Sequence, residues 1–409
     1  MMKKRLIVLF VVLSMLLPYA LVSCDDPNDD PQVELKSYKT YSFAYFDTIS
    51  TIIGYEANED DFGEVSGKAL TLLGEYHRLF DIYNEYEGIN NLCTINSIVD
   101  GEHPVVKVDR KIIDMLLYAK EMYNTTGGKM NVAMGSVLSI WHDYRTAGLE
   151  TPRDADTPPM DKLLLAAEHT DINDVIIDEK NSTVWLSDPE MKLDVGAFAK
   201  GYAVEMVARM LEGMGKSGYV LNVGGNIRTT GKKADGNKWK TGIENPTGDE
   251  DYPYVEYIGL EKEAIVTSGS YQRYYTVVVG AKCSKCDWVY DRSAGIPEQN
   301  IAPGTLPSHL VPSENKCPLC DGRIKKTSKN FHHIIDSETL MPSEKGMLSV
   351  SVICKDSGMG DGLSTALFCM TIEEGIAFIN SLEGVEAMWV AEDETKYYSD
   401  GFSKHFYQN

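Results

Sequence analysis

Apolar side chains recur along this chain at helical spacing in three places. Apolar residues at positions 69, 72, 73, 76 and 80, and again at 112, 116, 119 and 123, follow the three-to-four-residue period of a helix with one buried face. Residues 199–211 show the same period and run into Gly213 and Gly215, which favours a helix that stops there. These apolar positions are interpreted as core faces.

Other segments have the composition of strands. Residues 46–53 are rich in β-branched side chains, 219–223 form a short apolar run, and 175–186 predict two strands joined by a turn at Asn181-Ser182. Strands and helices are mixed without the regular alternation of a parallel α/β fold. The sequence therefore favours the α+β class.

The first 40 residues do not share these patterns. Three cations at positions 3–5 precede a twelve-residue apolar run, Leu6–Leu17, which is shorter than the roughly 20 residues that a membrane-spanning helix needs and fits the core of a signal peptide. The run ends at Leu21-Val22-Ser23-Cys24, which resembles the bacterial lipobox, whose Cys becomes the lipidated first residue. We therefore expect a signal at residues 1–23, an anchor at Cys24 and an exported lipoprotein on the periplasmic or extracytoplasmic face of the membrane. A plain secretory signal with an incidental Cys is the alternative.

Composition narrows the possible functions of the remainder. The 409 residues are 43% apolar and 10% aromatic, enough for a sizeable core, which excludes a mainly disordered chain. Acidic side chains outnumber basic ones by 61 to 39, and the formal charge is −22, which argues against a nucleic-acid binder. Residues 24–40 open with an acidic, Pro-interrupted stretch and are expected to form a tether. The globular domain is expected at 41–280 and 330–409.

Residues 281–329 differ from their surroundings and predict a small inserted module. They hold four of the eight Cys and carry eight basic against five acidic side chains within an acidic chain. Cys283, Cys286, Cys317 and Cys320 form two C-x-x-C pairs separated by 30 residues. Four thiolates in this pattern can bind iron or zinc in a tetrahedral site, and the metal replaces a core that so short a segment cannot build. Two disulfides are the alternative in an exported protein.

The residues between the two pairs resemble rubredoxin. The similarity rests on the segments Cys286–Asp291, Ile301–Thr305 and Cys317-Pro318, with Gly295 between them. It implies an Fe(Cys)₄ one-electron centre. Asp287 and Asp321 stand where rubredoxin-like pairs usually have Gly, so zinc remains open as the metal. The other three cysteines, Cys93, Cys354 and Cys369, have no predicted role.

Several segments outside the module are typical of a polyphosphate site. Gly224-Gly225 follows a strand and can bring backbone N–H groups close to a phosphate, although a structural turn is an equal alternative. Lys200 lies at the start of a predicted helix, where its charge and the helix dipole both favour an anion. Thr267–Tyr271, which includes Ser268, supplies hydroxyls. Residues 332–336 add a His-His pair.

Asp361 and Thr365 are four residues apart, on one face of an emerging helix. A carboxylate and a hydroxyl provide the oxygen ligands that suit Mg²⁺ shared with substrate phosphates. Taken alone, the pair would more often be part of a helix N-cap.

In order along the chain, these segments resemble the ApbE-type FAD:protein FMN transferases over about residues 41–280 and 330–409. The resemblance also uses Tyr86–Asn96 and Gly127–Asn131. It implies an ApbE-like core that transfers FMN from FAD to a Thr hydroxyl of an exported redox partner, with release of AMP. Two departures are Asn131, where an Asp is common, and 336–340, which lacks the usual Pro and Gly.

The resemblance also implies roles for individual residues. Asp361 and Thr365 match the side-chain ligands of Mg²⁺, with backbone oxygens from Ala197 and Ser364. His333 is a candidate proton shuttle, since His titrates near neutral pH, although a structural role is an equal alternative. The expected flavin contacts are Phe46, Tyr83 or Tyr86, Asn96, Lys129, Met130, Asn131, Asp194, Lys200, Gly224, Gly225, Ser268 and Ile335. Of these, Lys200 is also expected to act in catalysis.

Two further functions remain open from the sequence. With water as the nucleophile, the same site would act as an Mg²⁺-dependent FAD pyrophosphatase. Alternatively, the chain would be an electron-transfer lipoprotein in which the rubredoxin-like centre exchanges electrons with bound FAD. The module is predicted at the tip of two paired strands, Tyr275–Gly280 and Asn330–Asp336, and a metal far from the flavin site would argue against direct transfer.

Overall fold

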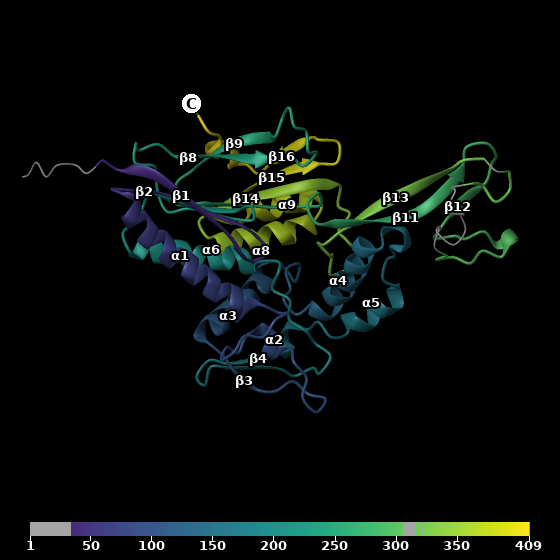
Figure 1. The fold of residues 1–409 in the computed structure, drawn as a ribbon, viewed down its shortest axis with the longest axis horizontal. Coiled ribbons are helices and arrows are strands. Elements are labelled where there is room, and N and C mark those ends of the chain that lie inside the picture. The colour runs from purple at the N-terminus through teal and green to yellow at the C-terminus, as the bar shows by residue number, and fades with distance from the viewer. Residues whose placement is uncertain (1–33, 306–315, 321, 409) are drawn as a thin grey trace, which may run out of the picture. The chain divides into compact units, whose positions relative to one another are not determined.

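The largest sheet of this computed structural model is antiparallel throughout, with the strand order β1-β2-β6-β7-β10-β14-β15-β16 (Figure 1). The structure describes residues 34–305, 316–320 and 322–408. Seven of the eight positions in β14 are buried, as expected for a strand covered on both faces. The strands of this sheet are β1 (Lys36–Tyr45), β2 (Thr48–Glu56), β6 (Tyr219–Val223), β7 (Asn226–Thr229), β10 (Ala264–Gly269), β14 (Met347–Cys354), β15 (Glu386–Ala391) and β16 (Lys396–Tyr398).

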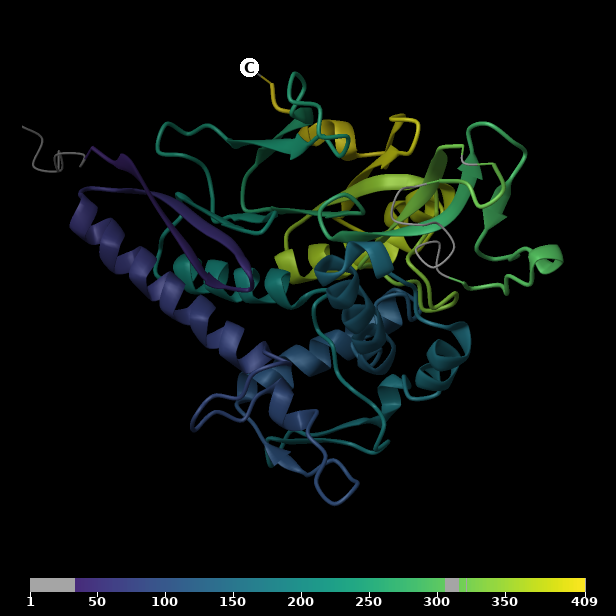
Figure 2. The same ribbon diagram turned by 45° about the vertical axis from the view of Figure 1, so that its right-hand side comes forward.

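Helices cover one face of this sheet and a two-stranded sheet covers the other (Figures 1 and 2). On the helical side, α1, α3, α6 and α8 contribute to the main hydrophobic core. On the opposite side, β8 and β9 share a second core with β10, β14 and β15. The bounds are α1 (Glu59–Phe80), α2 (Leu92–Ile95), α3 (Arg110–Thr125), α4 (Gly135–Glu150), α5 (Met160–Ala167), α6 (Ala199–Gly213), α8 (Ser357–Phe368), α9 (Ile372–Asn380), β8 (Trp239–Glu244) and β9 (Tyr254–Leu260), with short 3₁₀ turns at Pro152–Asp154, Ile172–Asp174, Pro297–Gln299 and Phe402–His405.

Two three-stranded sheets complete the fold. One is β3-β5-β4, and the other is β12-β11-β13, which carries the cysteine module. In the second sheet, β11 and β13 pair from Tyr274↔His332 to Cys283↔Ile324, so the predicted pairing is confirmed. The predicted bounds of the second strand, Asn330–Asp336, are wrong, because β13 ends at His332. The strands are β3 (Val106–Lys107), β4 (Val175–Asp178), β5 (Thr183–Leu186), β11 (Tyr274–Cys283), β12 (Val289–Asp291) and β13 (Ile324–His332).

Most elements predicted from the apolar pattern are confirmed, and one boundary is wrong. The predicted helices correspond to α1, α3 and α6, the pair of strands in 175–186 to β4 and β5, and the strand 219–223 to β6. The strand predicted to begin at Phe46 instead begins at Thr48. Phe46 and Asp47 form the turn between β1 and β2, with φ of 55° and 49°, because the chain must reverse direction there.

The ends of the predicted segments also differ from the strands. β1 begins at Lys36, within the expected tether, and β11 and β13 continue across the expected limits of the module. No helix among the described residues is long and apolar enough to cross a membrane. The predicted signal at 1–23 and the lipidation site Cys24 lie outside the described residues.

Candidate active site and metal centre

The centre of the candidate active site is a buried carboxylate held between two helices. Asp361 on α8 is only 4% exposed. Its Oδ2 accepts hydrogen bonds from the Gly201 amide, at 2.8 Å, and from the Asn226 side chain, at 2.9 Å, and lies 3.7 Å from Lys200 Nζ. The expected neighbours Asp361 and Lys200, 161 positions apart in the sequence, are therefore brought together.

Glycine makes this close approach possible. A Cβ at Gly201 on α6 would lie 2.3 Å from the Ser357 carbonyl oxygen and 2.5 Å from Asp361 Cβ, distances that no side chain allows. The start of α6 therefore packs directly against α8. The Gly201 N–H, one of the first amides of α6, donates to a carboxylate, as expected where helix N-termini favour negative charge.

The predicted Mg²⁺ ligands lie together at the same place. Thr365 Oγ1 lies one turn beyond Asp361 on α8 and donates to the Ala197 carbonyl oxygen at 3.1 Å. Ser364 Oγ bonds to Ser268 Oγ at 2.8 Å, which joins β10 to the site. No described residue forms a hydrogen bond with Asp361 Oδ1, so one carboxylate oxygen remains available. This set of oxygen donors fits a hard cation such as Mg²⁺.

The N-cap reading of this pair is wrong. The first turn of α8 begins at Ser357, and the N-cap is Asp356, whose side chain accepts from the Met359 amide at 2.9 Å. Asp361 therefore lies in the second turn, where its carboxylate is not needed by the helix. Its placement is consistent with a functional role.

Behind the site, a buried ionic network fixes α6 against α8. Glu205 on α6 is 3% exposed and accepts hydrogen bonds from the side chains of Arg209 and Arg228 and from the Ser357 amide. Arg209 also pairs with Asp356 at 2.7 Å. These partners were not predicted from the sequence, because they come from three separate segments.

The paired glycines form a tight turn whose amides are already bonded. Gly224 and Gly225 have φ of 57° and 92° and join β6 to β7. The Gly224 amide donates to the Ile49 carbonyl at 3.2 Å, and the Gly225 amide donates to the Asn222 side chain at 3.1 Å. In this conformation the turn is structural, and a phosphate would have to displace the Asn222 contact to reach the Gly225 amide.

The turn at Phe46 lies beside these glycines. A Cβ at Gly224 would lie 2.6 Å from Thr48 Oγ1, and the Phe46 amide donates to His77 Nδ1 at 3.3 Å. Left-handed backbone at a bulky residue is strained. Strain kept at Phe46 is consistent with its predicted contact to flavin.

A second group of predicted residues surrounds Asp194. Asn96 bonds through both ends of its amide to the backbone of Leu193, at 2.7 and 2.9 Å, and so positions the loop rather than offering a free group. Burial raises the pKa of the Asp194 carboxyl group, although a hydrogen bond that this carboxylate accepts from the Gly196 amide, at 2.8 Å, acts in the opposite direction. Tyr83 is 61% exposed, and its ring lies against the ring of His142, with 5.3 Å between the two centroids.

Tyr86 and Asn131 form other contacts. The Tyr86 hydroxyl donates to Asp81 at 2.8 Å. The Asn131 side chain bonds to Thr170 and to the Ala133 amide, and Met130 is fully buried. The Asp194 amide donates to Val132, so the 130–132 segment lies beside the Asp194 loop.

Lys129 and Asn131 border an open cleft of about 580 Å³. Lys129 also pairs with Glu338 at 2.6 Å. The cleft is large enough for part of a nucleotide. Its wall is formed by Tyr123, Gly127, Gly128, Lys129, Asn131, Ala167, Glu168, Thr170, Asp171, Asn173, Ser337 and Glu338.

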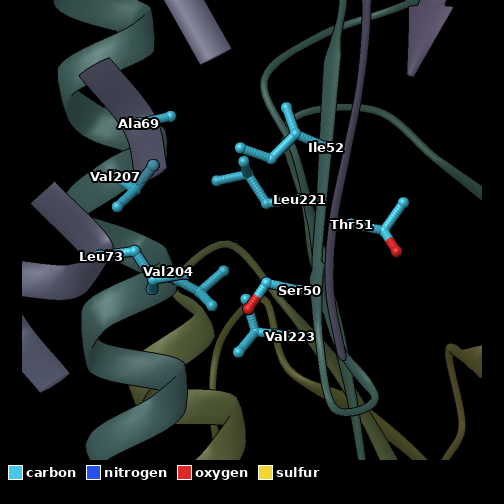
Figure 3. Close-up of a pocket in the computed structure, with 9 residues that line it drawn as sticks. All are labelled: Ser50, Thr51, Ile52, Ala69, Leu73, Val204, Val207, Leu221 and Val223. Atoms are coloured by element: carbon cyan, nitrogen blue, oxygen red, sulfur yellow. The ribbon is translucent and has the colours of Figure 1, made fainter. Parts of the chain in front are cut away.

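A cavity beneath the large sheet is too small for a ligand. Its volume is about 10 Å³, and it lies among apolar side chains of β2, β6, α1 and α6 (Figure 3). Ser50 Oγ points into this region and has no hydrogen-bond partner among the described residues. The space suits one buried water at most.

His333 follows directly after β13. Its amide donates to the Arg273 carbonyl at 3.2 Å, which extends the β11–β13 ladder by one pair. Desolvation, the Arg273 charge and weaker contributions from His332 and Lys200 lower the pKa of His333 to about 3. The Lys200 contribution places His333 within electrostatic reach of the candidate active site. Ile335 is buried, and its carbonyl accepts from Cys369 Sγ at 3.9 Å.

Comparison with known protein families agrees with this fold and site. The sequence model of the ApbE family matches residues 46–305 and 321–389 of this chain. The chain belongs to the ApbE family. Among its relatives, a protein named FAD:protein FMN transferase from Klebsiella pneumoniae is 26% identical over 325 residues, which cover 77% of this chain and 82% of that protein. A protein of the same name from Treponema pallidum is 25% identical over 307 residues, 72% of this chain and 69% of that protein.

Solved structures of ApbE proteins share the fold. The ApbE protein of Thermotoga maritima aligns with a TM-score of 0.68 at 22% identity, and the flavin transferase ApbE of Vibrio cholerae with a TM-score of 0.65 at 21% identity. Each alignment covers 91% of this chain and all of the solved chain. The predicted α+β class and the ApbE-like core are confirmed.

The four cysteines of the inserted module form one cluster. Their Sγ atoms all lie within 4.8 Å of one another, and none of the seven described cysteines is in a disulfide. Backbone amides of Lys285 and Leu319 donate to Cys283 and Cys317 at 3.2 and 3.4 Å. The disulfide alternative is wrong, and the cluster can hold a metal ion.

Gly322, one residue after the position where rubredoxin-like pairs usually have Gly, leaves room for the cysteine side chains. A Cβ at Gly322 would lie 2.7 Å from Cys283 Sγ and 3.2 Å from Cys320 Sγ. Asp287 does not belong to the described residues with positive φ. The substitution of Gly by Asp at that position therefore costs no backbone strain.

Proposed function

We propose that this protein is an FAD:protein FMN transferase that moves FMN from FAD to a Thr hydroxyl of an exported partner protein and releases AMP. The observation that carries the proposal is the grouping of the buried Asp361 with the partly buried Lys200, Thr365 and Ala197 carbonyl between α6 and α8. The names of the curated relatives support the same activity.

The residues of the site suit this reaction. The acceptor oxygen attacks the phosphorus of the FMN half, and the bond to the phosphate oxygen of AMP breaks. Lys200 neutralises negative charge on the pyrophosphate, and such electrostatic stabilisation carries much of phosphoryl-transfer catalysis. Bound Mg²⁺ would be held by Asp361, Thr365 and the carbonyl oxygens of Ala197 and Ser364, and would stabilise charge on the leaving group. The proton released by the acceptor passes to a base, and His333 is our candidate for that role.

The proposal includes location and a second metal. A lipid anchor at Cys24 would hold the enzyme at the outer side of a membrane, where an exported acceptor is found. The cysteine cluster would bind iron or zinc through Cys283, Cys286, Cys317 and Cys320.

Geometry argues against the electron-transfer alternative. Cys283 lies nine positions after Tyr274 along β11, which at about 3.3 Å per residue corresponds to roughly 30 Å. His333 and the candidate active site lie at the Tyr274 end of this hairpin. Direct transfer between the cluster and a flavin held at Lys200 would have to cross that length.

The test is to incubate the protein with FAD, Mg²⁺ and an exported flavin-acceptor domain. The expected result is covalent FMN on a Thr of the acceptor, detected by mass spectrometry, with AMP released in equal amount. Free FMN and AMP without covalent product would instead indicate a pyrophosphatase. FAD retained without turnover would overturn both readings.

A further inference from the structure

Strand β13 has an edge that no other described strand covers. It pairs with β11, which pairs with β12 on its far side. Six consecutive residues of β13, from Lys325 to Asn330, are exposed on both faces. An uncovered edge of this kind is a template for strand addition.

The hydrogen bonds at its two ends show which backbone groups face the open side. The His333 amide and the Arg323 carbonyl both bond toward β11, to Arg273 and Ser284. Alternate residues face alternate sides, so Lys326, Ser328 and Asn330 present their N–H and C=O groups to the open edge. The irregularity in the pairing lies in β11, between Val278 and Gly280, and leaves this alternation intact.

Positive charge gathers at the same edge. Lys325 and Lys326 are exposed and form no ion pair within the described part of the chain, and the same holds for Lys282, directly opposite Lys325. Like charges opposite each other on paired strands repel. The chain as a whole carries −22. An acidic partner would thus be repelled by most of the protein and attracted here.

The edge leads toward the candidate active site. Lys326 precedes His333 by seven residues, or about 23 Å of extended chain. A strand added along β13 would therefore begin beside the lysines and end beside His333, within electrostatic reach of Lys200.

We propose that the open edge of β13 docks an extended acidic segment of the acceptor protein by strand addition and guides the acceptor hydroxyl to the flavin site. The proposal rests on the proposed function and adds the route by which the acceptor binds. Backbone hydrogen bonds at Lys326, Ser328 and Asn330 supply sequence-independent affinity, and Lys325 and Lys326 select acidic side chains.

The test measures binding without catalysis, so that its failure is distinct from failure of the transferase activity. The probe is a fluorescein-labelled peptide of about ten residues, enough to span the edge at 3.3 Å per residue, that alternates Asp with Val and carries one Thr; its binding to the full chain is followed by fluorescence anisotropy. Replacing both lysines, Lys325→Glu and Lys326→Glu, is expected to weaken binding about tenfold, since each exposed ion pair contributes up to about 1 kcal/mol. The matched charge control, Lys180→Glu with Lys404→Glu, changes exposed lysines elsewhere and should leave binding unchanged.

A second pair of variants tests the backbone contacts. Ser328→Pro removes an N–H that faces the open edge and leaves the ladder to β11 intact, because Pro is tolerated on edge strands with that side free. It should weaken binding about fivefold, the worth of about one hydrogen bond, whereas Ser328→Ala should not. FAD affinity should be the same in all variants.

Two results would overturn the proposal. One is equal peptide binding by Ser328→Pro and Ser328→Ala together with no effect of the lysine changes. The other is that the peptide does not bind, whereas vesicles of phosphatidylcholine and phosphatidylserine bind the wild type in a sedimentation assay and do not bind the variant with Lys325→Glu and Lys326→Glu. That result would make the β13 edge a membrane-binding surface.

Discussion

The candidate active site and the cysteine module are built in opposite ways. The active site lies between α6 and α8, inside the largest hydrophobic core, and its groups are held by helix packing and the Glu205 network. The module has a small core in which Ala281, Trp288, Tyr290 and Ile324 surround the cysteines. The candidate active site is therefore ordered by the fold itself, whereas the module, if it binds the proposed metal ion, would depend on that ion and its four thiolates.

The two regions are nevertheless mechanically joined. Strands β11 and β13 run from one to the other, and Arg292 of the module forms an ion pair with Asp156, next to α5. Tyr275 on β11 also donates to the Asp156 carbonyl at 2.8 Å. Substitutions in one region therefore test whether the structure of the other region depends on it.

The largest effect is expected at Asp361. Asp361→Asn keeps the size of the side chain but removes the charge that would hold the cation and attract Lys200. We expect the rate of FMN transfer to fall about 100- to 1000-fold, the usual loss for a group that stabilises developing charge. Initial rates with saturating FAD provide the measurement, and metal content of the cysteine cluster should not change.

The control for this change is Asp60→Asn, at the exposed start of α1. It removes the same charge from an exposed side chain that has no contact with Asp361, Lys200 or Thr365 among those described above, and it should keep full activity. Retention of activity in Asp361→Asn would refute the assignment of the cation site.

The reverse experiment removes a thiolate from the module. Cys286→Ser should lower metal affinity by about 100-fold or more, since loss even of supporting partners costs 10- to 100-fold. Elemental analysis should show loss of the metal, and limited proteolysis should cut within the module. FAD binding at the core-supported site should persist.

Cys93→Ser is the matched control, because Cys93 lies outside the cluster. If Cys286→Ser also abolished FAD binding, the two regions would form one cooperative unit and the contrast drawn above would be wrong.

A smaller effect is expected at Thr365. Its hydroxyl lies 3.1 Å from the Ala197 carbonyl and contributes one neutral oxygen to the set. Thr365→Ala should lower the transfer rate about tenfold and raise the Mg²⁺ concentration needed, because one ligand is worth about 1 to 1.5 kcal/mol. Thr365→Ser should restore most of the rate. Equal loss in both variants would mean that the methyl group, not the hydroxyl, matters.

The contrast between the regions also explains what could be predicted from the sequence. The cluster was predictable because its ligands lie in two short repeats whose spacing encodes the geometry. Asn226 as a partner of Asp361 was not predicted, since 135 positions separate them and only tertiary packing brings them together. The true start of α8 was hidden by Gly358 and Gly360, which weaken the helical pattern of its first turn. The turn at Phe46 was missed because a bulky residue with positive φ is rare.

The smallest expected effect concerns His333, which joins the hairpin of the module to the active site. Desolvation and the charges of Arg273 and Lys200 lower the pKa of His333 to about 3, so the free enzyme holds it neutral between pH 5 and 8. FAD bound beside Lys200 brings negative phosphates, which favour the protonated form and raise this pKa. The acid limb of kcat should therefore lie at higher pH than that of kcat/KM, and His333→Gln should remove the difference.

The lowered pKa of His333 also predicts how the stability of the protein depends on pH. A His whose folded-state pKa lies below its ordinary value of 6.5 binds its proton more readily in the unfolded chain. The free energy of unfolding should then fall as the pH drops below about 6.5, and part of that fall should vanish in His333→Gln. Part of His333 remains exposed to solvent, which limits both its desolvation and the effect of the neighbouring charges and keeps the change in stability small. Thermal unfolding of both proteins at pH 7.5 and pH 5 measures it. The wild type should lose more in Tm than His333→Gln, and equal losses would show that the pKa of His333 is not lowered in the folded protein.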